Sequence, residues 1–163
     1  MIGMKRIIIT GPTGAIGMAI IQQMLEHNIE VIAICNPNSK RISQLPKSSM
    51  VRIVKCDLSN LKELSSMNLP TCDAFYHLGW AGTIGKGRND IILQEKKCPL
   101  YFGCGRGRLR SWVFLLYRCR FPSGIWPCGR SLTTDHTCIP GDGYGMAKLC
   151  AGMMSICVVI SWR

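Results

Sequence analysis

The sequence predicts an α/β fold with a doubly wound parallel sheet that is incomplete, together with an irregular segment over residues 98–142. Two observations predict the sheet. Short apolar, β-branched runs alternate with helix-like segments over the first 97 residues, and a glycine-rich turn joins the first run to the first helix. A third observation, an abrupt change of composition near Cys98, predicts the irregular segment. The length of 163 residues fits one domain.

Four strands are expected, each a short and mostly apolar run that suits a buried position in a parallel sheet. They fall at residues 5–10, 30–35, 51–57 and 73–78. Strands that alternate with helices pair in parallel through right-handed crossovers.

The helices between these strands are also marked in the sequence. Over residues 15–27, the apolar residues Ile16, Ala19, Ile20 and Met24 have the spacing of an amphipathic helix. A short helix is expected before the third strand. Another is expected over residues 60–67, with Ser59 or Asn60 as its cap.

The turn Gly11-Pro12-Thr13-Gly14-Ala15-Ile16-Gly17 is the strongest single motif. A glycine-rich turn directly after a buried strand, opening a helix, lets backbone N–H groups approach a pyrophosphate. A Cβ atom would block either the tight turn or the approach of the ligand. The motif therefore predicts a dinucleotide site, against the simpler interpretation of an ordinary strand-to-helix turn.

Charge and cysteine are unevenly distributed. The formal net charge is +11 and the chain has ten cysteines. Residues 98–163 contain no glutamate and a single lysine, yet seven of the cysteines. A folded surface normally mixes Lys and Glu with Arg, so this composition is unusual for a domain.

Two further function classes are weighed against the dinucleotide site. A zinc site could draw on Cys98, Cys104, Cys119, Cys128, Cys138 and His136, but no Cys-x-x-Cys pair exists. A single-strand nucleic-acid site could use the Arg/Gly stretch of residues 103–112, which has a stacking aromatic at Trp112. We favour neither, and no metal is expected. Nucleic-acid binding becomes a serious alternative if residues 98–142 are genuine coding sequence.

Several motifs together resemble the extended short-chain dehydrogenase/reductase family, in its NAD-dependent epimerase/dehydratase branch. The Gly-x-x-Gly-x-x-Gly turn is typical of it. The stretch Cys56-Asp57-Leu58 is similar to the family's acidic site that contacts adenine. The stretch Phe75-Tyr76-His77-Leu78-Gly79-Trp80-Ala81-Gly82 is similar to the motif that lines the nicotinamide side. Gly143-Tyr144-Gly145-Met146-Ala147-Lys148 resembles the catalytic Tyr-x-x-x-Lys helix.

The resemblance covers residues 4–97 and about 143–155. It implies a Rossmann-like sheet, an NAD or NADP cofactor and a nucleotide-sugar substrate, with a homodimer possible among intact relatives. The reaction implied is epimerisation, dehydration or reduction after transient oxidation at a sugar carbon.

Tyr144 and Lys148 are the candidate catalytic pair. Four residues apart on a helix, they share one face. Tyrosine has an ordinary pKa near 10, and a nearby ammonium favours the phenolate, which makes Tyr144 a candidate general acid/base. The resemblance also implies that Lys148 holds the nicotinamide ribose.

The second strand is followed by Cys35-Asn36-Pro37-Asn38-Ser39-Lys40-Arg41, without the acid that usually binds the ribose 2′-OH of NAD. Asn36, Ser39, Lys40 and Arg41 are therefore candidate cofactor contacts, and the two cations slightly favour the 2′-phosphate of NADP. The alternative interpretation is a solvated basic loop.

Residues 98–142 are interpreted as an out-of-frame segment. Suitable codons for residues 117–126 give, in another frame, FIGAGSQAEYG, a strand ending in Gly-x-Gly-Ser. One inserted base before Cys98 and one lost base near residues 140–142 would account for the altered composition. Residues 156–163 are interpreted as an aberrant tail after a second shift. A sequencing error, a true mutation and genuine coding sequence remain open.

The family also requires a Ser or Thr about two dozen residues before the tyrosine. Ser123 has that spacing, but its surroundings do not match, so we give it no role. The chain is also about half the length expected for the family. We therefore expect it to be inactive alone, with a noncatalytic dinucleotide-binding fragment as the alternative. Residues 98–142 are expected to be poorly ordered, because they do not read as the fifth strand that the sheet requires. No signal peptide or membrane span is evident, which predicts a cytoplasmic protein with reduced cysteines.

Overall fold

The computed structural model describes residues 3–95, 113–118 and 140–160. The chain divides into two compact units. The first unit comprises residues 1–79 and 103–119, and the second comprises residues 80–102 and 120–163. Each unit is described by itself.

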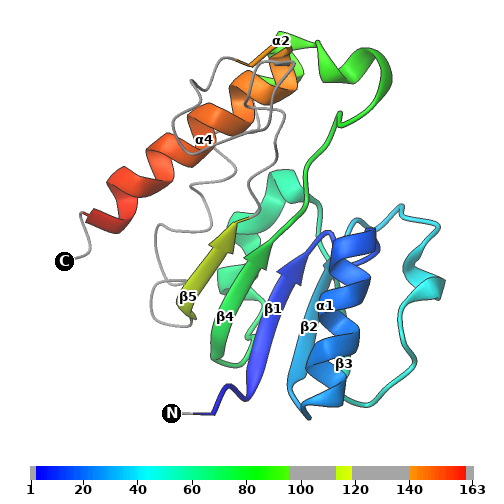
Figure 1. The fold of residues 1–163 in the computed structure, drawn as a ribbon. Coiled ribbons are helices and arrows are strands. Elements are labelled where there is room, and N and C mark those ends of the chain that lie inside the picture. The colour runs from blue at the N-terminus through cyan, green and yellow to red at the C-terminus, as the bar shows by residue number, and fades with distance from the viewer. Residues whose placement is uncertain (1–2, 96–112, 119–139, 161–163) are drawn as a thin grey trace, which may run out of the picture. The chain divides into compact units, whose positions relative to one another are not determined.

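The first unit is built on a parallel sheet of five strands in the order β3-β2-β1-β4-β5 (Figure 1). The strands are β1 (Arg6–Thr10), β2 (Glu30–Cys35), β3 (Val51–Lys55), β4 (Cys72–His77) and β5 (Val113–Arg118). Each neighbouring pair is parallel. The prediction of a doubly wound, Rossmann-like α/β sheet is confirmed. The chain winds from β1 outward to β3 and then returns to β4, so the winding reverses between β1 and β4.

The two faces of the sheet carry separate hydrophobic cores, because successive side chains of a strand point to opposite faces. On one face Ile7, Ile9 and Ala33 pack with Ile21 of helix α1 (Ala15–Glu26). The opposite core contains residues of β1, β2 and β4 together with two leucines of the 3-10 helix η2 (Leu58–Ser66). These core residues include Ile8, Ile32, Ile34, Phe75, Leu61 and Leu64.

The apolar spacing predicted for α1 matches its inward face in part, since Ile20 and Met24 pack against the core. The expected inward face contained Ile16 and Ala19, but Ile16 is 45% exposed and Ala19 is exposed too. Gly17 and Ile21 are the buried residues instead. A Cβ atom on Gly17 would overlap the carbonyl oxygen of Gly11, so the helix turns its glycine toward the strand end. This contact determines the rotation of the helix, and Ile16 consequently points outward.

Strand β3 is less buried than the sequence predicted. Its residues are exposed or half-buried, with Arg52, Ile53 and Lys55 exposed. The reason is its position at the edge of the sheet, where β2 is its one strand partner among the described residues. Charged side chains on an edge strand also discourage pairing with another chain.

The short helices after β2 and β3 are present with altered details. A single 3-10 turn, η1 (Ile42–Gln44), precedes β3 as expected. The helix predicted over residues 60–67 is the 3-10 helix η2 instead, and its cap is Asp57, not Ser59 or Asn60. The Asp57 carboxylate accepts the Ser59 N–H at 2.9 Å, so it satisfies a donor that the helix start leaves unpaired.

Strand β5 corrects the expectation that residues 98–142 cannot supply a fifth strand. Residues Val113–Arg118 pair in parallel with β4, with Val113 opposite Cys72 and Arg118 opposite His77. Their sequence, VFLLYR, is β-branched, aromatic and aliphatic, which suits a strand. The pairing also gives partners to backbone groups of β4 that would otherwise lie at a sheet edge.

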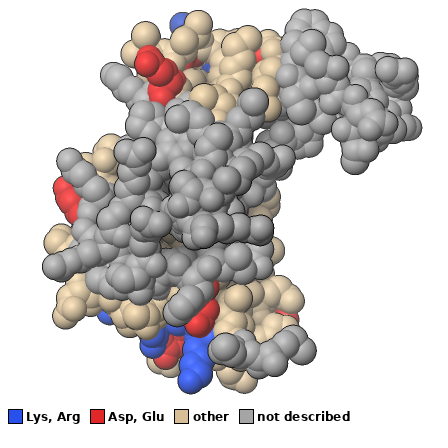
Figure 2. Space-filling model, turned by 90° about the vertical axis from the view of Figure 1, so that its left-hand side faces the viewer, with Lys and Arg blue, Asp and Glu red and all other residues tan. Residues whose placement is uncertain are grey.

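The first unit carries charges of both signs where β1 and β4 begin, at the lower end of the molecule in Figure 2. Arg6 Nε lies 2.6 Å from Glu30 Oε2. Asp73 Oδ2 accepts the backbone N–H groups of Lys5 at 2.6 Å and Arg6 at 2.9 Å. These two hydrogen bonds hold the pKa of Asp73 below its ordinary value. They tie the start of β1 to that of β4.

The second unit contains the 3-10 helix η3 (Gly85–Arg88), the short helix α2 (Ile91–Glu95) and the long helix α4 (Gly143–Ile160). Helix α2 contacts α4. Helix α4 begins at the predicted residue and continues through residues 156–160, part of the expected aberrant tail. Within the three described stretches of chain, no helix is long and apolar enough to cross a membrane.

Candidate functional site

The glycine turn brings the end of β1 into backbone contact with the end of β4. Gly11 has φ +68°, a conformation that favours glycine. A Cβ atom there would lie 2.9 Å from the backbone nitrogen of Gly79 and 3.0 Å from the carbonyl carbon of Leu78. No side chain fits between these two strand ends. A glycine is therefore required at position 11 by the fold itself.

Gly14 differs from Gly11 and Gly17 in having room around it. It has an ordinary φ of −82°, and the nearest atom to an added Cβ would be the Gly11 oxygen at 3.5 Å, a normal contact. Gly14 also precedes the first turn of α1, which has no side-chain cap and no acidic residue. Backbone N–H groups at a helix start are unpaired within the helix and carry partial positive charge. This end of α1 can accept an anion.

A buried polar pair lies beside the turn. Thr10 Oγ1 is 2.7 Å from Nδ1 of His77 and accepts the N–H of Gly79 at 3.1 Å. Thr10 and His77 are both buried. The Leu58 side chain packs against Gly79, because a Cβ atom on Gly79 would lie 2.9 Å from Leu58 Cδ2. These contacts fix the backbone where β4 ends and the predicted residues Leu78 and Gly79 follow.

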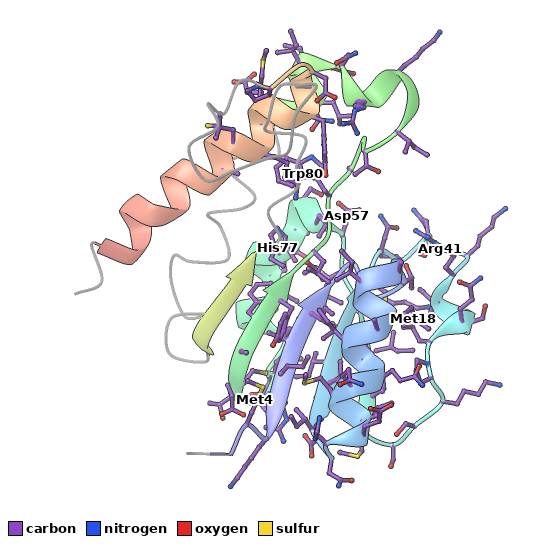
Figure 3. All side chains as sticks on the ribbon, viewed as in Figure 1. Met4, Met18, Arg41, Asp57, His77 and Trp80 are labelled. Carbon is purple, nitrogen blue, oxygen red and sulfur yellow. The ribbon has the colours of Figure 1, made fainter. Side chains whose placement is uncertain are left out.

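The carboxyl ends of β2 and β3 bring Asn36 and Asp57 together. Asn36 Nδ2 donates to Asp57 Oδ2 at 2.7 Å, and Asp57 Oδ1 accepts the Ser59 hydroxyl at 2.7 Å. Both predicted residues thus belong to one hydrogen-bonded group. Figure 3 shows Asp57 and Arg41 at the end of the sheet where the strand arrows point.

Lys40 and Arg41 are both exposed on the loop after β2. The Arg41 backbone N–H lies 3.4 Å from the hydroxyl of Ser39. Ion pairs involving described residues join Arg6 to Glu30 and Arg88 to Asp142, and neither includes these two loop cations. Their charges are therefore available to an anionic ligand or to solvent.

In the second unit, Tyr144 and Lys148 lie near each other on α4, as their spacing predicted. The Lys148 ammonium is 5.9 Å from the centre of the Tyr144 ring and 4.0 Å from the centre of the Trp80 ring. Trp80 and Tyr144 meet edge to face at 5.9 Å between ring centres. The three side chains form one group, which includes one residue predicted to line the cofactor and the two predicted to be catalytic.

Asp142 and Arg88 hold the start of α4. Asp142 Oδ1 accepts the Gly145 N–H at 2.6 Å, and Oδ2 accepts from Arg88 Nε at 2.6 Å. Burial raises the pKa of Asp142, but the hydrogen bonds from Gly145 and Arg88 and the charge of Arg88 outweigh it, so the pKa is lowered. The Arg88 guanidinium also lies 4.8 Å from the centre of the Tyr144 ring. Sequence reasoning did not identify Arg88 or Asp142, although an Asp just before a predicted helix is a recognised capping signal.

The other predicted cofactor contacts, Thr13, Ala15 and Ile16, lie in the glycine turn and first helical turn of the first unit. Trp80, Tyr144 and Lys148 belong to the second unit. Thr10 and Gln94 are buried polar residues that sequence reasoning missed. In the sequence, each looks like an ordinary strand or helix residue, because its hydrogen-bond partner is distant in the chain.

Neither the zinc site nor the Arg/Gly stretch can be placed, since their candidate residues lie outside the described residues. Among the described residues, no group of three or more His, Cys, Asp or Glu side chains could hold a metal ion. The described cysteines Cys35, Cys56 and Cys72 are free thiols. Burial raises the pKa of Cys72 to about 11, which keeps that thiol protonated and a poor metal ligand.

The chain belongs to the NAD dependent epimerase/dehydratase family, whose sequence profile matches residues 7–94. No functionally curated protein matches it by sequence.

Solved structures share the fold at low sequence identity. A UDP-galactose 4-epimerase is 18% identical with a TM-score of 0.76, covering 91% of this chain and 50% of that chain. UDP-glucuronic acid 4-epimerase from Bacillus cereus, in complex with NAD, is 20% identical with a TM-score of 0.69; the match covers 94% of this chain and 51% of that one. The Bordetella bronchiseptica enzyme WbmG, in complex with NAD and UDP, is 17% identical with a TM-score of 0.73, covering 94% and 50% respectively. The chain thus spans about half the length of these structures.

Proposed function

We propose that the chain is the dinucleotide-binding part of an NAD(P)-dependent enzyme that epimerises, dehydrates or reduces a nucleotide sugar. Family membership supports the cofactor, because the family is named for its dependence on NAD. The single observation that carries the proposal is the space at Gly14. The fold requires glycine at positions 11 and 17, but no atom of the described residues requires it at position 14.

A bound pyrophosphate would account for the presence of glycine at position 14. The residue precedes an uncapped helix start that lacks acidic side chains, and a Cβ there would occupy the place from which backbone N–H groups reach an anion. Thr13, Ala15 and Ile16 complete this proposed contact. Gly11 and Gly17 support it by letting the turn and the helix approach the strands.

The adenosine end of the cofactor is proposed to lie at the ends of β2 and β3. Asp57 and Leu58 would contact the adenine, and Asn36 and Ser39 the ribose. Lys40 and Arg41 would bind a 2′-phosphate with charge-assisted hydrogen bonds, so we propose a slight preference for NADP. Their exposure and lack of a described ion-pair partner support this assignment.

The nicotinamide end is proposed to lie along Leu78, Gly79 and Trp80. When bound, the cofactor supplies reversible acceptance of a hydride from a sugar carbon. Tyr144 would act as general acid/base toward the sugar hydroxyl, because a nearby cation favours its phenolate. Lys148 would provide that charge and hold the nicotinamide ribose. Their shared position on α4 supports the pairing.

The substrate class is proposed from solved neighbours. One Bacillus cereus structure is a UDP-glucuronic acid 4-epimerase in complex with UDP-glucuronic acid and NAD. Such similarity supports a nucleotide sugar for the family to which this chain belongs. A homodimer is likewise a proposal for intact relatives.

We also propose that residues 98–142 are read out of frame and that these 163 residues do not turn over a sugar by themselves. The support is the composition of the segment and the absence of a matching Ser or Thr before Tyr144. Residues 1–97 and the Tyr-x-x-x-Lys helix at 143–155 would then be the functional parts. Sequencing the gene and weighing the intact protein would test the frame directly.

Titration of the protein with NADPH and NADH, followed by cofactor fluorescence, tests the proposal. Both should bind, NADPH somewhat more tightly. Replacing both loop cations in a Lys40→Glu/Arg41→Glu variant should reverse that preference, with about a tenfold loss for NADPH and little change for NADH. Lys47→Glu, another exposed cation, is the matched control. Binding of neither cofactor by the unmodified chain would overturn the proposal.

A further inference from the structure

We propose that Trp80 is a positioning residue for Lys148, and that Gln94 holds the Trp80 ring in place. This inference rests on the proposed function, since it assigns Lys148 a catalytic role. It gives Trp80 a role beyond contact with the cofactor. The residues involved all belong to the second unit.

The geometry is that of a cation–π contact. Lys148 Nζ lies 4.0 Å from the centre of the Trp80 ring, closer than its 5.9 Å from the Tyr144 ring centre. Tryptophan has the most favourable ring for an ammonium. A lysine stem has several rotatable bonds, so an unanchored ammonium samples many positions. The indole restricts this sampling.

The indole is itself fixed. Trp80 Nε1 donates to Gln94 Oε1 at 2.8 Å. The Gln94 amide nitrogen donates to the carbonyl oxygens of Gly82 at 2.9 Å and Gly87 at 2.8 Å. Gln94 is 1% exposed, so losing these bonds would leave buried polar groups unpaired. The amide therefore has one favourable orientation, which sets the position of the indole N–H.

The choice of an indole also matters electrostatically. A carboxylate would hold the ammonium too, but it would cancel the positive charge felt by Tyr144. An aromatic ring holds the ammonium without adding a net charge. The Asp142 carboxylate at the start of α4 is engaged elsewhere, with one oxygen on Arg88 and the other on Gly145. Trp80 thus contacts the Lys148 ammonium without cancelling its charge.

Carbon-13 NMR of the protein with its lysines reductively dimethylated tests the contact, because dimethylation keeps the charge. The Lys148 resonance, assigned by its loss in Lys148→Arg, should be shifted upfield by the ring current of Trp80. Trp80→Leu should return it to the position of exposed lysines, and Trp80→Phe should leave a smaller shift. Gln94→Leu should also reduce the shift. Ile84→Leu, at an 84% exposed position, is the control and should change nothing.

An unshifted Lys148 resonance, or one unchanged in Trp80→Leu and Trp80→Phe, would overturn the proposal. Where Trp80→Leu fails to fold, the reduced shift in Trp80→Phe decides. NADPH affinity then tests positioning: Trp80→Leu should weaken it about tenfold, and Trp80→Phe should largely restore it. Equal affinity in all three would refute the positioning role. A shifted resonance in a protein that binds neither NADPH nor NADH would refute the proposed function and leave the contact intact.

Discussion

Backbone packs directly on backbone at the glycine turn of the first unit, whereas long side chains hold the region around Tyr144 in the second. Gly11 and Gly17 leave no room for a Cβ beside neighbouring backbone atoms. Around Tyr144, by contrast, Arg88 reaches Asp142 across 54 residues of sequence, and Gln94 reaches Trp80 across 14. The first arrangement demands particular residue types at short, fixed spacing. The second depends on partners that only the fold brings together.

The largest loss of stability is expected for a substitution at Gly17. In Gly17→Ala, the added Cβ would overlap the Gly11 oxygen and lie 2.8 Å from Pro12 Cα, both backbone atoms that cannot move aside cheaply. We expect a loss of about 2–3 kcal/mol in the free energy of unfolding, despite the better helix propensity of alanine. Urea unfolding followed by circular dichroism measures it. Gly3→Ala, with no atom within 4 Å, is the control, and equal stability of the two variants would contradict the account.

A smaller effect is expected at Asp142, where side chains carry the structure. Asp142→Ala removes both the cap of α4 and the partner of Arg88. The expected loss is about 1–2 kcal/mol in urea unfolding. Asp142→Asn keeps an oxygen for the Gly145 N–H and should lose less. If alanine and asparagine cost the same, the cap contributes nothing measurable.

The smallest expected effect is a dependence of stability on acid at Asp73. Its folded pKa is lowered by the N–H groups of Arg6 and Lys5, so folding favours the charged form. This stabilisation is complete above the ordinary pKa of aspartate and is lost as pH falls through the lower folded value. The loss should be about 1 kcal/mol or less, and Asp73→Asn should flatten the acid limb of a stability–pH curve. An acid limb of the same slope in the variant would show that other carboxylates cause it.

The difference between the two regions also explains what could be predicted from the sequence. The turn from Gly11 to Gly17 and the four strands were predictable because periodicity and glycine spacing are local. The apolar pattern of α1 was right for Ile20 and Met24 but not for Ile16, because the contact of Gly17 with the turn after β1 is not visible in that pattern. The exposure of strand β3 was not predictable, because it follows from the edge position of the strand. That position depends on the order of the strands in the sheet.

Strand β5 was missed for a different reason. The composition of residues 98–142 is unusual for a folded domain, and this obscures the β-forming run at Val113–Arg118, which pairs with β4. Arg88, Gln94 and Thr10 were missed because their roles come from partners distant in sequence. The helix carrying Tyr144 and Lys148 was predictable, since their spacing of four places both on one face. The contact of Trp80 with both side chains was not predictable.

A fluorescence titration tests most directly whether the turn from Gly11 to Gly17 binds a dinucleotide. NADPH and NADH are titrated against the unmodified chain, Gly14→Ala and Gly3→Ala. A Cβ at Gly14 meets only ordinary contact at 3.5 Å, so Gly14→Ala should unfold like the unmodified chain. We expect that it nevertheless binds the cofactor at least about tenfold more weakly, while Gly3→Ala binds normally. Equal affinity in Gly14→Ala, or no binding by the unmodified chain, would contradict the assignment of this turn to a dinucleotide.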